Sequence, residues 1–273
     1  MKCCGKAFKH SSWALLMMLC GGLWFQVPPA QAGTPISLHQ THAGNVNFVG
    51  TAGSLRRGST PRNACAVDNT DSASLNGLPA GASIRAAYLY WAGSYSNQAR
   101  STQRTPDWDV TFEGQSLTAD RQFIEVYGEA GGRYDFFSGM KDVTAIVAGK
   151  GNGLYTFGNL DVNTKAPHCD VQAVLAGWSL IVVYEHAAES NRVINIFDGF
   201  EMCQGGQISV TANNFEIATT DINGQVGHLT WAGDAGTSGS LGGFTESLLF
   251  NGNPLLDGRN PVNNQFNSTV TGR

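Results

Sequence analysis

The hydrophobic pattern of the chain is strongest near its middle, in the stretch VQAVLAGWSLIVVYEH from Val171 to His186. Its apolar core has about a dozen residues, fewer than the ~20 that a membrane-spanning helix requires, and its second half is β-branched. The pattern predicts a central β-strand. One face would carry Trp178, Leu180, Val182 and Tyr184, and the other Ile181 and Val183. Since both faces are apolar, we expect other elements to cover both of them.

A polar break follows this strand at Glu189, Ser190 and Asn191. Polar residues between two β-rich segments are typical of a chain reversal. We therefore expect a long hairpin, in which residues 193–197 return alongside the central strand.

Short apolar or alternating segments separated by turn residues fill most of the remaining chain. They predict strands at 45–49, 83–91, 108–113, 116–127, 154–160, 207–215, 227–232 and 245–250. Asp142 can cap a short helical turn near 142–148, which Gly149 can end. The sequence thus predicts an all-β fold, a jelly-roll-like β-sandwich of antiparallel strands with one short helical turn.

The first 32 residues have the three parts of a secretory signal. Lys2, Lys6 and Lys9 precede an apolar segment at 13–25, and an Ala-x-Ala site ends at Ala32. We expect cleavage after Ala32, so that Gly33 begins a secreted, extracellular or cell-surface protein with no remaining membrane span. Residues 33–273 would form a single domain. Their polar end has no evident closing strand, so we expect the domain to be truncated at its C-terminus.

Charge and composition narrow the classes of partner. Loss of the three signal lysines changes the net charge from −4 to −7, which argues against nucleic acid as the main partner. Charged residues make up 14% of the chain, below the ~25% of an average soluble domain. A high content of Gly, Asn, Ser and Thr suits the turns and outer faces of extracellular β-sandwiches.

Three cysteines remain after the predicted cleavage: Cys65, Cys169 and Cys203. An odd number in an oxidising compartment indicates one disulfide and one further thiol. We predict a Cys65–Cys169 disulfide, because it would anchor a turn-rich loop to the start of the central strand. A Cys65–Cys203 disulfide is the alternative.

Several motifs occur in a characteristic order, among them AYLYWAGS, DVTFEGQSLTADR, VQAVLAGWSLIVVYE, GHLTWAGDAG and LLFNGNPL. In them the chain resembles the amino-terminal β-rich module of large, uncharacterised bacterial surface or secreted proteins, which often carry Ig-like conserved repeats. This resemblance implies no catalytic residues. The turn at Asp142 also resembles one in jelly-roll carbohydrate-binding domains.

The candidate chemistry is sparse. Asp68 and Asp71 could contribute to a calcium site, the one cofactor that the sequence suggests, but simple Asx-turns are the favoured explanation, because the spacing matches no established calcium loop. His168 is an isolated loop histidine. A hydrolase would need two carboxylates across a cleft, for which the sequence offers Asp107, Asp109, Glu113, Asp198 and Glu201.

Trp91, Trp108 and Trp231 lie near strand ends, where exposed indole rings could stack on sugar rings. The competing and favoured interpretation places these rings in the core. We therefore expect a non-catalytic extracellular module for adhesion or structural support, whose partner is a protein or glycan surface. A carbohydrate-binding module using exposed tryptophans is the alternative, and a secreted hydrolase is the third.

Overall fold

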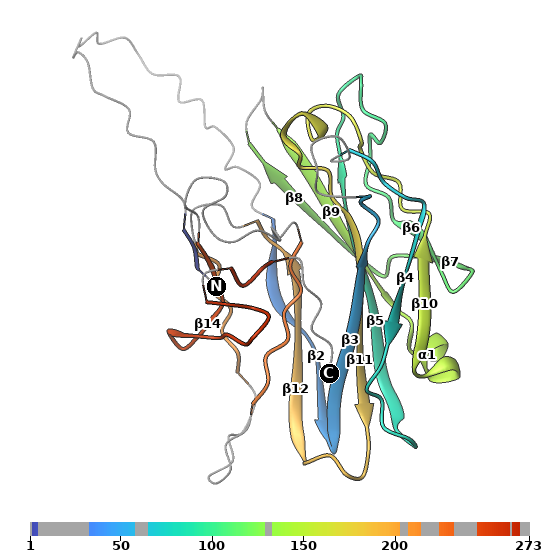
Figure 1. Ribbon diagram of the computed structural model, residues 1–273, viewed down its shortest axis with the longest axis vertical. Helices are drawn as coiled ribbons and strands as arrows, with labels where there is room; N and C mark the ends of the chain where they lie inside the picture. The colour runs from blue at the N-terminus through green and yellow to red at the C-terminus, as the bar shows by residue number, and fades with distance from the viewer. Residues whose placement is uncertain are drawn as a thin grey trace, which may run out of the picture.

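A computed structural model describes residues 2–4, 33–57, 65–128, 133–202, 207–213, 224–231, 245–262 and 264–267. In these residues the protein is mostly β, with several antiparallel sheets and a single short α-helix. Figure 1 shows the sheets as successive layers seen nearly edge-on. The predicted all-β class is confirmed, whereas the jelly-roll connectivity stays a prediction.

The middle layer is a five-stranded antiparallel sheet in the order β3-β11-β5-β9-β8. Its strands are β3 (Val46–Ser54), β11 (Ala176–Glu185), β5 (Ser83–Tyr95), β9 (Tyr134–Asp142) and β8 (Arg121–Tyr127). The apolar stretch near the middle of the sequence forms β11, which pairs with β3 on one side and β5 on the other. The prediction of a central strand is confirmed.

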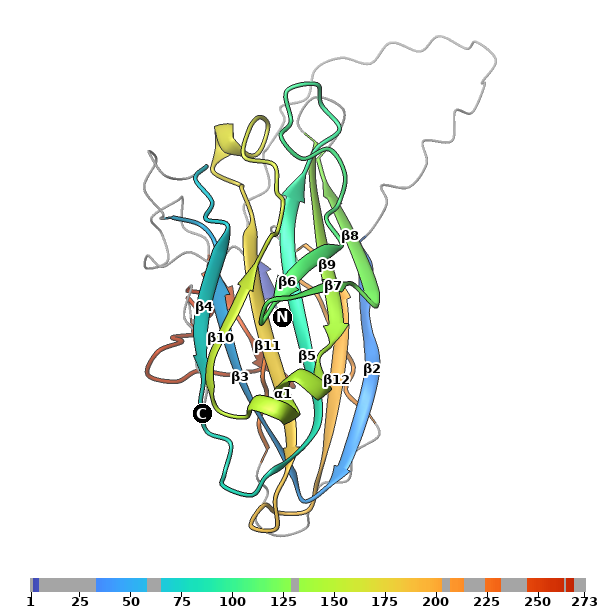
Figure 2. The ribbon, with the colours of Figure 1, turned by 90° about the vertical axis from the view of Figure 1, so that its right-hand side faces the viewer.

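A four-stranded antiparallel sheet in the order β4-β10-β6-β7 packs against one face of the middle layer (Figure 2). Its strands are β4 (Thr70–Leu75), β10 (Gly153–Gly158), β6 (Asp109–Phe112) and β7 (Gln115–Thr118). The turn between β6 and β7 is formed by Glu113 and Gly114, which both have positive φ, as a two-residue hairpin turn requires. The sequence Glu113-Gly114 indicates a tight hairpin, which is confirmed between β6 and β7. The single strand predicted at 116–127 is wrong, because it is divided into β7 and β8, which lie in different sheets. No strand was predicted where β4 lies.

The main core lies between these two sheets. On β11, Trp178, Leu180, Val182 and Tyr184 all point into it. Ile181 and Val183 point to the opposite face and belong to a second cluster. The alternation predicted from the sequence is therefore confirmed, and both faces of β11 are covered.

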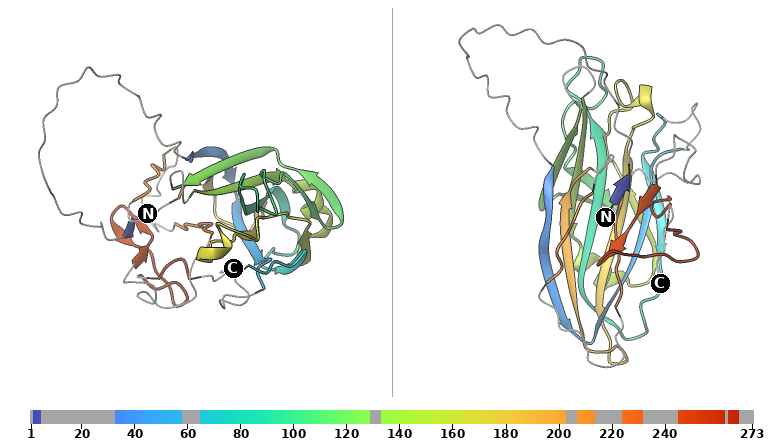
Figure 3. Two further views of the ribbon diagram at one scale, coloured as in Figure 1. Left: turned by 90° about the horizontal axis from the view of Figure 1, so that it is seen from above. Right: turned by 90° about the vertical axis from the view of Figure 1, so that its left-hand side faces the viewer.

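The second face of the middle sheet is covered by a two-stranded ribbon of β2 (Thr34–Gly44) and β12 (Arg192–Phe200) (Figure 3, right). The expected hairpin is therefore wrong in its pairing, because β12 pairs with β2 and not with β11. The chain does reverse after β11, but it crosses into another layer. The chain likewise reverses between β2 and β3, beside the first reversal.

Glu189 holds these two reversals together. Its carboxylate accepts hydrogen bonds from Tyr184 Oη at 2.7 Å and Asn47 Nδ2 at 2.9 Å. Its backbone carbonyl accepts one from Asn45 Nδ2 at 2.6 Å. The polar break in the sequence thus supplies the acceptors that fix the corner.

The helix α1 spans Thr144–Lys150, close to the predicted turn. The Asp142 carboxylate accepts the N–H of Thr144 at 2.9 Å, but the capping residue is Val143. The helix ends at Gly151, whose N–H bonds to the carbonyl of Val147, so the expectation that Gly149 ends it is wrong. In the described part of the chain, no helix has the length and apolarity needed to cross a bilayer.

The remaining elements are short. They are β1 (Lys2–Cys4), η1 (Cys169–Val171), β13 (Thr245–Ser247), β14 (Leu249–Phe250) and β15 (Asn253–Pro254). β1 pairs with β13, although it belongs to the segment predicted to be removed. Residues 207–213 and 227–231 form no strand, so the strands predicted there are wrong for the described residues. An ordered β13–β15 region agrees with the strand predicted at 245–250.

Candidate functional site

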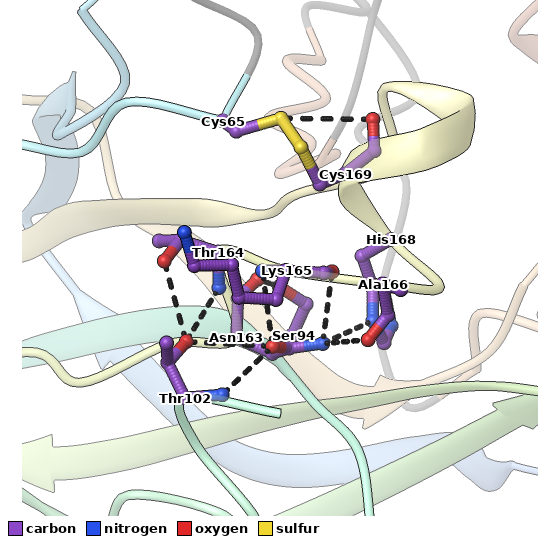
Figure 4. Close-up of a disulfide and its surroundings, with 9 residues drawn as sticks. All are labelled: Cys65, Ser94, Thr102, Asn163, Thr164, Lys165, Ala166, His168 and Cys169. Atoms are coloured by element: carbon purple, nitrogen blue, oxygen red, sulfur yellow. Dashed lines mark hydrogen bonds between the residues drawn. A yellow bond between two sulfur atoms is a disulfide. The ribbon is translucent and has the colours of Figure 1, made fainter. Parts of the chain in front are cut away.

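One end of the molecule is held by a disulfide between Cys65 and Cys169, whose Cα atoms lie 5.3 Å apart (Figure 4). The predicted pairing is confirmed, and Cys203 lies outside the described residues. The bond closes a loop of 104 residues, and chain-entropy arguments give such a closure about 4–5 kcal/mol of stabilisation. We call Cys65 with the segments 96–108 and 159–175 the stapled end.

Asn163 is the centre of a buried hydrogen-bond network at the stapled end (Figure 4). Its Nδ2 donates to the carbonyls of Lys165 and Ala166 at 3.2 Å, and to His168 Nδ1 at 3.1 Å. Its Oδ1 accepts from the backbone N–H of Thr102 at 3.2 Å. A fully satisfied buried network of this kind favours one arrangement of the loops around it.

His168 is fully buried and takes part in the same network. Its Nε2 donates to the carbonyl of Asp135 at 3.1 Å, so its Nδ1 is the acceptor for Asn163. Burial lowers the pKa of His168, although the bond to Asp135 opposes this. The sequence interpretation of an isolated loop histidine is therefore wrong. A neutral ring joins the loop to β9.

The rim of the stapled end is polar and exposed. Exposed side chains here are Asn97, Gln98, Arg100, Arg104, Lys165 and Asp170. The buried polar atoms beneath these side chains hydrogen-bond to one another. The loops that carry the rim are therefore held in one arrangement.

A second polar cluster, which we call the polar seam, lies between the β2–β12 ribbon and the middle sheet. Asp198 is buried and accepts from Arg121 at 2.9 Å and from Tyr90 Oη at 3.5 Å. His39 and His42 face Tyr88, with His42 Nε2 3.4 Å from the Tyr88 hydroxyl.

Burial is the main cause of the pKa shifts in the polar seam. It raises the pKa of Tyr90 far above its ordinary value, with the charge of Asp198 acting in the same direction. It also lowers the pKa values of His39 and His42. At neutral pH, the two tyrosines and two histidines are therefore kept uncharged around the ion pair of the buried Asp198 with the partly exposed Arg121.

Residues 31–271 match a family described as protein of unknown function (DUF3344). The match covers most of the chain. This chain belongs to the DUF3344 family. No curated protein and no solved structure matches it. The family description carries no activity, so the candidate residues of this DUF3344 protein are judged by their geometry alone.

None of the three tryptophans considered for sugar stacking has a fully exposed ring. Trp91 is fully buried, and its indole N–H donates to the carbonyl of Asp107 at 3.1 Å. Trp108 is half-buried and packs edge-on against Phe137, with ring centroids 5.5 Å apart. Trp231 is half-buried against the middle sheet and the ribbon. The core interpretation is confirmed for Trp91, which no ligand can reach here.

The two aspartates suggested for calcium already have protein partners. Asp68 forms an exposed ion pair with Arg57 at 2.5 Å. Asp71 accepts the indole N–H of Trp178 at 2.8 Å, which ties β4 to the core. Among the described residues, no group of three or more His, Cys, Asp or Glu side chains could hold a metal ion.

The carboxylates considered for a hydrolase each bond to a partner in a different part of the fold. Asp107 accepts the N–H groups of Asp109 and Asp161, at 3.2 and 2.7 Å, and burial raises its pKa. Glu113 pairs with Lys150. Asp109 accepts from Thr118, Asp198 belongs to the polar seam, and Glu201 accepts the N–H of Ile36. Each of these carboxylates therefore has a partner that fixes local structure.

The sequence interpretation missed Asn163, His39 and His42 as members of polar clusters. Asn163 looks like any loop asparagine in the sequence. His39 and His42 lie three positions apart, so strict strand alternation would place them on opposite faces. An irregularity in the pairing of β2, opposite Ile196 and Phe197, accompanies their common orientation, and no sequence signal marks it.

Proposed function

We propose that this protein is an exported, non-catalytic module that binds a partner through the exposed rim of its stapled end. It would serve adhesion or structural support at the cell surface. The observation that supports this proposal is the Cys65–Cys169 disulfide with the buried Asn163 network. A disulfide that closes a long loop is typical of an extracytoplasmic protein.

Rigidity is the physical reason to favour a binding role. Loops that are already ordered lose little conformational entropy when a partner docks on them. Thr102 and Thr164 join the two loops of the stapled end, because Thr164 N–H donates to Thr102 Oγ1 at 2.9 Å. The rim therefore behaves as one preformed surface. Exposed arginine on that surface suits a protein interface, where arginine is enriched.

The resemblance of the sequence motifs to amino-terminal modules of bacterial surface proteins agrees with this proposal. In that arrangement Ig-like repeats would follow the module, which would present its stapled end to the surroundings. The glycan-binding alternative loses Trp91 and depends on Trp108 and Trp231, whose rings pack against other side chains. The hydrolase alternative is weakened because each candidate carboxylate already accepts hydrogen bonds or pairs with a cation within the fold.

A bead-retention experiment tests the proposal. Beads carrying residues 33–273 are passed over surfaces coated with intact bacterial cells, purified cell-wall polysaccharide or extracellular-matrix protein. We expect retention on one protein-bearing surface and a fall of about tenfold for Arg100→Glu, which corresponds to about 1.4 kcal/mol of binding free energy.

A matched control places the same change in charge at the opposite end of the molecule. Ala145 and Ala148 are exposed on α1. α1 lies far along the long axis from the loop between β5 and β6, which carries Arg100 (Figure 2). The double variant Ala145→Asp, Ala148→Glu should be retained like the parent. Equal loss in both variants, or retention on polysaccharide alone, would contradict the proposal.

A further inference from the structure

A buried carboxylate lies where the residue before β2 meets β8 and the segment that follows β12. Glu125, on β8, is only 7% exposed. Its Oε1 accepts the N–H of Val126 at 3.0 Å, and its Oε2 accepts the N–H of Met202 at 3.1 Å. A third N–H donor is the backbone of Gly33. The partners of Glu125 in the described part of the chain are thus neutral amide groups.

The electrostatic setting of Glu125 favours a positive partner. Burial raises the pKa of Glu125, and the nearby carboxylate of Glu201 raises it further, while the three N–H donors act in the opposite direction. Glu201 itself accepts the N–H of Ile36 at 3.1 Å, on the same stretch of β2. The amides stabilise the charged carboxylate with partial dipoles, whereas a cation at the same place would oppose the penalty of burial and the charge of Glu201 with a full positive charge.

Only glycine fits at position 33, beside the Glu125 carboxylate. It is buried, and a Cβ atom placed on it would overlap both Glu125 Oε2 and the carbonyl oxygen of Phe200. Figure 2 shows the start of β2 beside β8. The close approach brings the backbone nitrogen of Gly33, and no side chain, to the carboxylate. This nitrogen is also the one that the predicted signal cleavage would free.

We propose that Glu125 forms a built site for a free amino terminus, and that its occupant is the α-ammonium group of Gly33 after cleavage of the Ala32–Gly33 bond. Hydrolysis of that bond by water leaves a carboxylate on Ala32 and an amine on Gly33, which takes up a proton. The new cation replaces a neutral N–H donor at the same position. Cleavage therefore turns a buried carboxylate that only neutral amides contact into one half of an ion pair.

The ion pair would link removal of the signal to completion of the fold. Glu125 already contacts the segment that follows β12 through Met202, and Gly33 immediately precedes β2, so the pair joins the ends of the β2–β12 ribbon to the edge of the middle sheet. In the uncleaved chain the ribbon would be held less firmly. The processed protein would then be the more stable form outside the cell, where the ribbon is needed.

A four-protein comparison tests this site with purified, disulfide-bonded chains. Two chains begin at Gly33 and at Ala32, and each is made with Glu125 and with Glu125→Gln. We expect the one-residue extension to raise the unfolding equilibrium constant at least tenfold when Glu125 is present, as measured by urea denaturation. With Glu125→Gln the extension should have no destabilising effect.

Glu201→Gln provides the matched control, because it makes the same chemical change on the neighbouring carboxylate. In that background the extension should still destabilise the protein at least tenfold. An equal effect of the extension in all three backgrounds would identify a steric cause and overturn the proposal. No effect with Glu125 present would overturn it as well.

A second measurement does not depend on a variant that folds. The pKa of the α-amino group in the chain that begins at Gly33 is followed by NMR. We expect it to lie at least one unit above the ordinary value of about 8, a tenfold change in its protonation equilibrium. An unshifted pKa would overturn the proposal.

The inference depends on export and on cleavage after Ala32, which mass spectrometry of the exported protein checks separately. A different amino terminus would overturn the occupant assigned here. Failure of the stability and pKa measurements would leave the proposed surface function untouched, since those measurements do not involve the stapled end.

Discussion

The two faces of the five-stranded sheet are covered in contrasting ways. Toward the four-stranded sheet the contacts are mainly aromatic and apolar: Trp178 stacks on Phe157 with ring centroids 5.6 Å apart, and Phe112 meets Trp178 edge-on at 6.1 Å. Toward the β2–β12 ribbon the face carries the polar seam. One face is thus held by packing, and the other combines packing with specific polar pairs.

This difference shows what determines the position of each layer on the middle sheet. Apolar burial has no direction and tolerates small shifts of one sheet over the other. Buried polar groups must meet particular partners, so a misplaced ribbon would leave the Asp198 carboxylate unpaired at a large cost. We infer that the apolar face supplies most of the stability, and that the polar seam selects the position of the ribbon.

The largest effect is expected on the apolar face. Trp178→Ala removes a fully buried indole from the main core and should lower the free energy of unfolding by about 3–5 kcal/mol. Urea denaturation measures the change. Trp108→Ala is the control, because Trp108 is only half-buried, and it should cost clearly less. A smaller loss for Trp178 than for Trp108 would contradict the assignment of the main core.

The next effect concerns the ion pair of the polar seam. Asp198→Ala leaves Arg121 without its buried acceptor and should cost about 1–3 kcal/mol. In the control Asp68→Ala, the lost ion pair with Arg57 is exposed at both side chains, so the cost should stay below about 1 kcal/mol. Equal costs in the two variants would show that the seam does not specify the ribbon.

The polar seam should also respond to pH. Burial lowers the pKa values of His39 and His42 in the folded protein, so their contribution to stability is complete above the unfolded value of about 6.5. It is lost as the pH falls below that value, because the unfolded chain binds protons first. The double variant His39→Gln, His42→Gln should flatten part of this slope in denaturation curves recorded between pH 7 and 5. An unchanged slope would contradict the prediction.

The smallest effects compare one hydroxyl on each face. Tyr155 Oη donates to the carbonyl of Gly151 at 2.7 Å, whereas Tyr90 Oη donates to Asp198 at 3.5 Å. Tyr155→Phe should therefore cost about 1 kcal/mol, and Tyr90→Phe about 0.5 kcal/mol or less. Thermal denaturation of the pair checks the order. The reverse order would indicate that the longer bond is the stronger one.

The sequence predicted those features that depend on local pattern. The period-two alternation of β11 indicated which side chains share a face, and Glu113 with Gly114 indicated a tight hairpin. The positions of the cysteines favoured a Cys65–Cys169 disulfide, because this bond would anchor a turn-rich loop to the start of the central strand. Each of these predictions follows from residues close together or from one simple constraint.

The sequence misplaced those features that depend on choice of partner. The segment that forms β12 was expected to return along β11, because consecutive strands commonly pair. In the fold both neighbours of β11 are already β3 and β5, so β12 pairs with β2 instead. The sequence likewise suggested several carboxylates for catalysis, because it could not show the hydrogen-bond donors that already engage them in the fold.

The amino-acid sequence by itself determined that the chain is β-rich, that its middle strand is buried on both faces, and which cysteines are available to pair. Only the tertiary structure decided which strands lie side by side, which face holds the polar seam, and that Gly33 meets Glu125. The physical reason is the distance along the chain over which each effect acts. Alternation and turn preference act between neighbours, whereas a buried polar atom is satisfied by groups that can lie a hundred residues away.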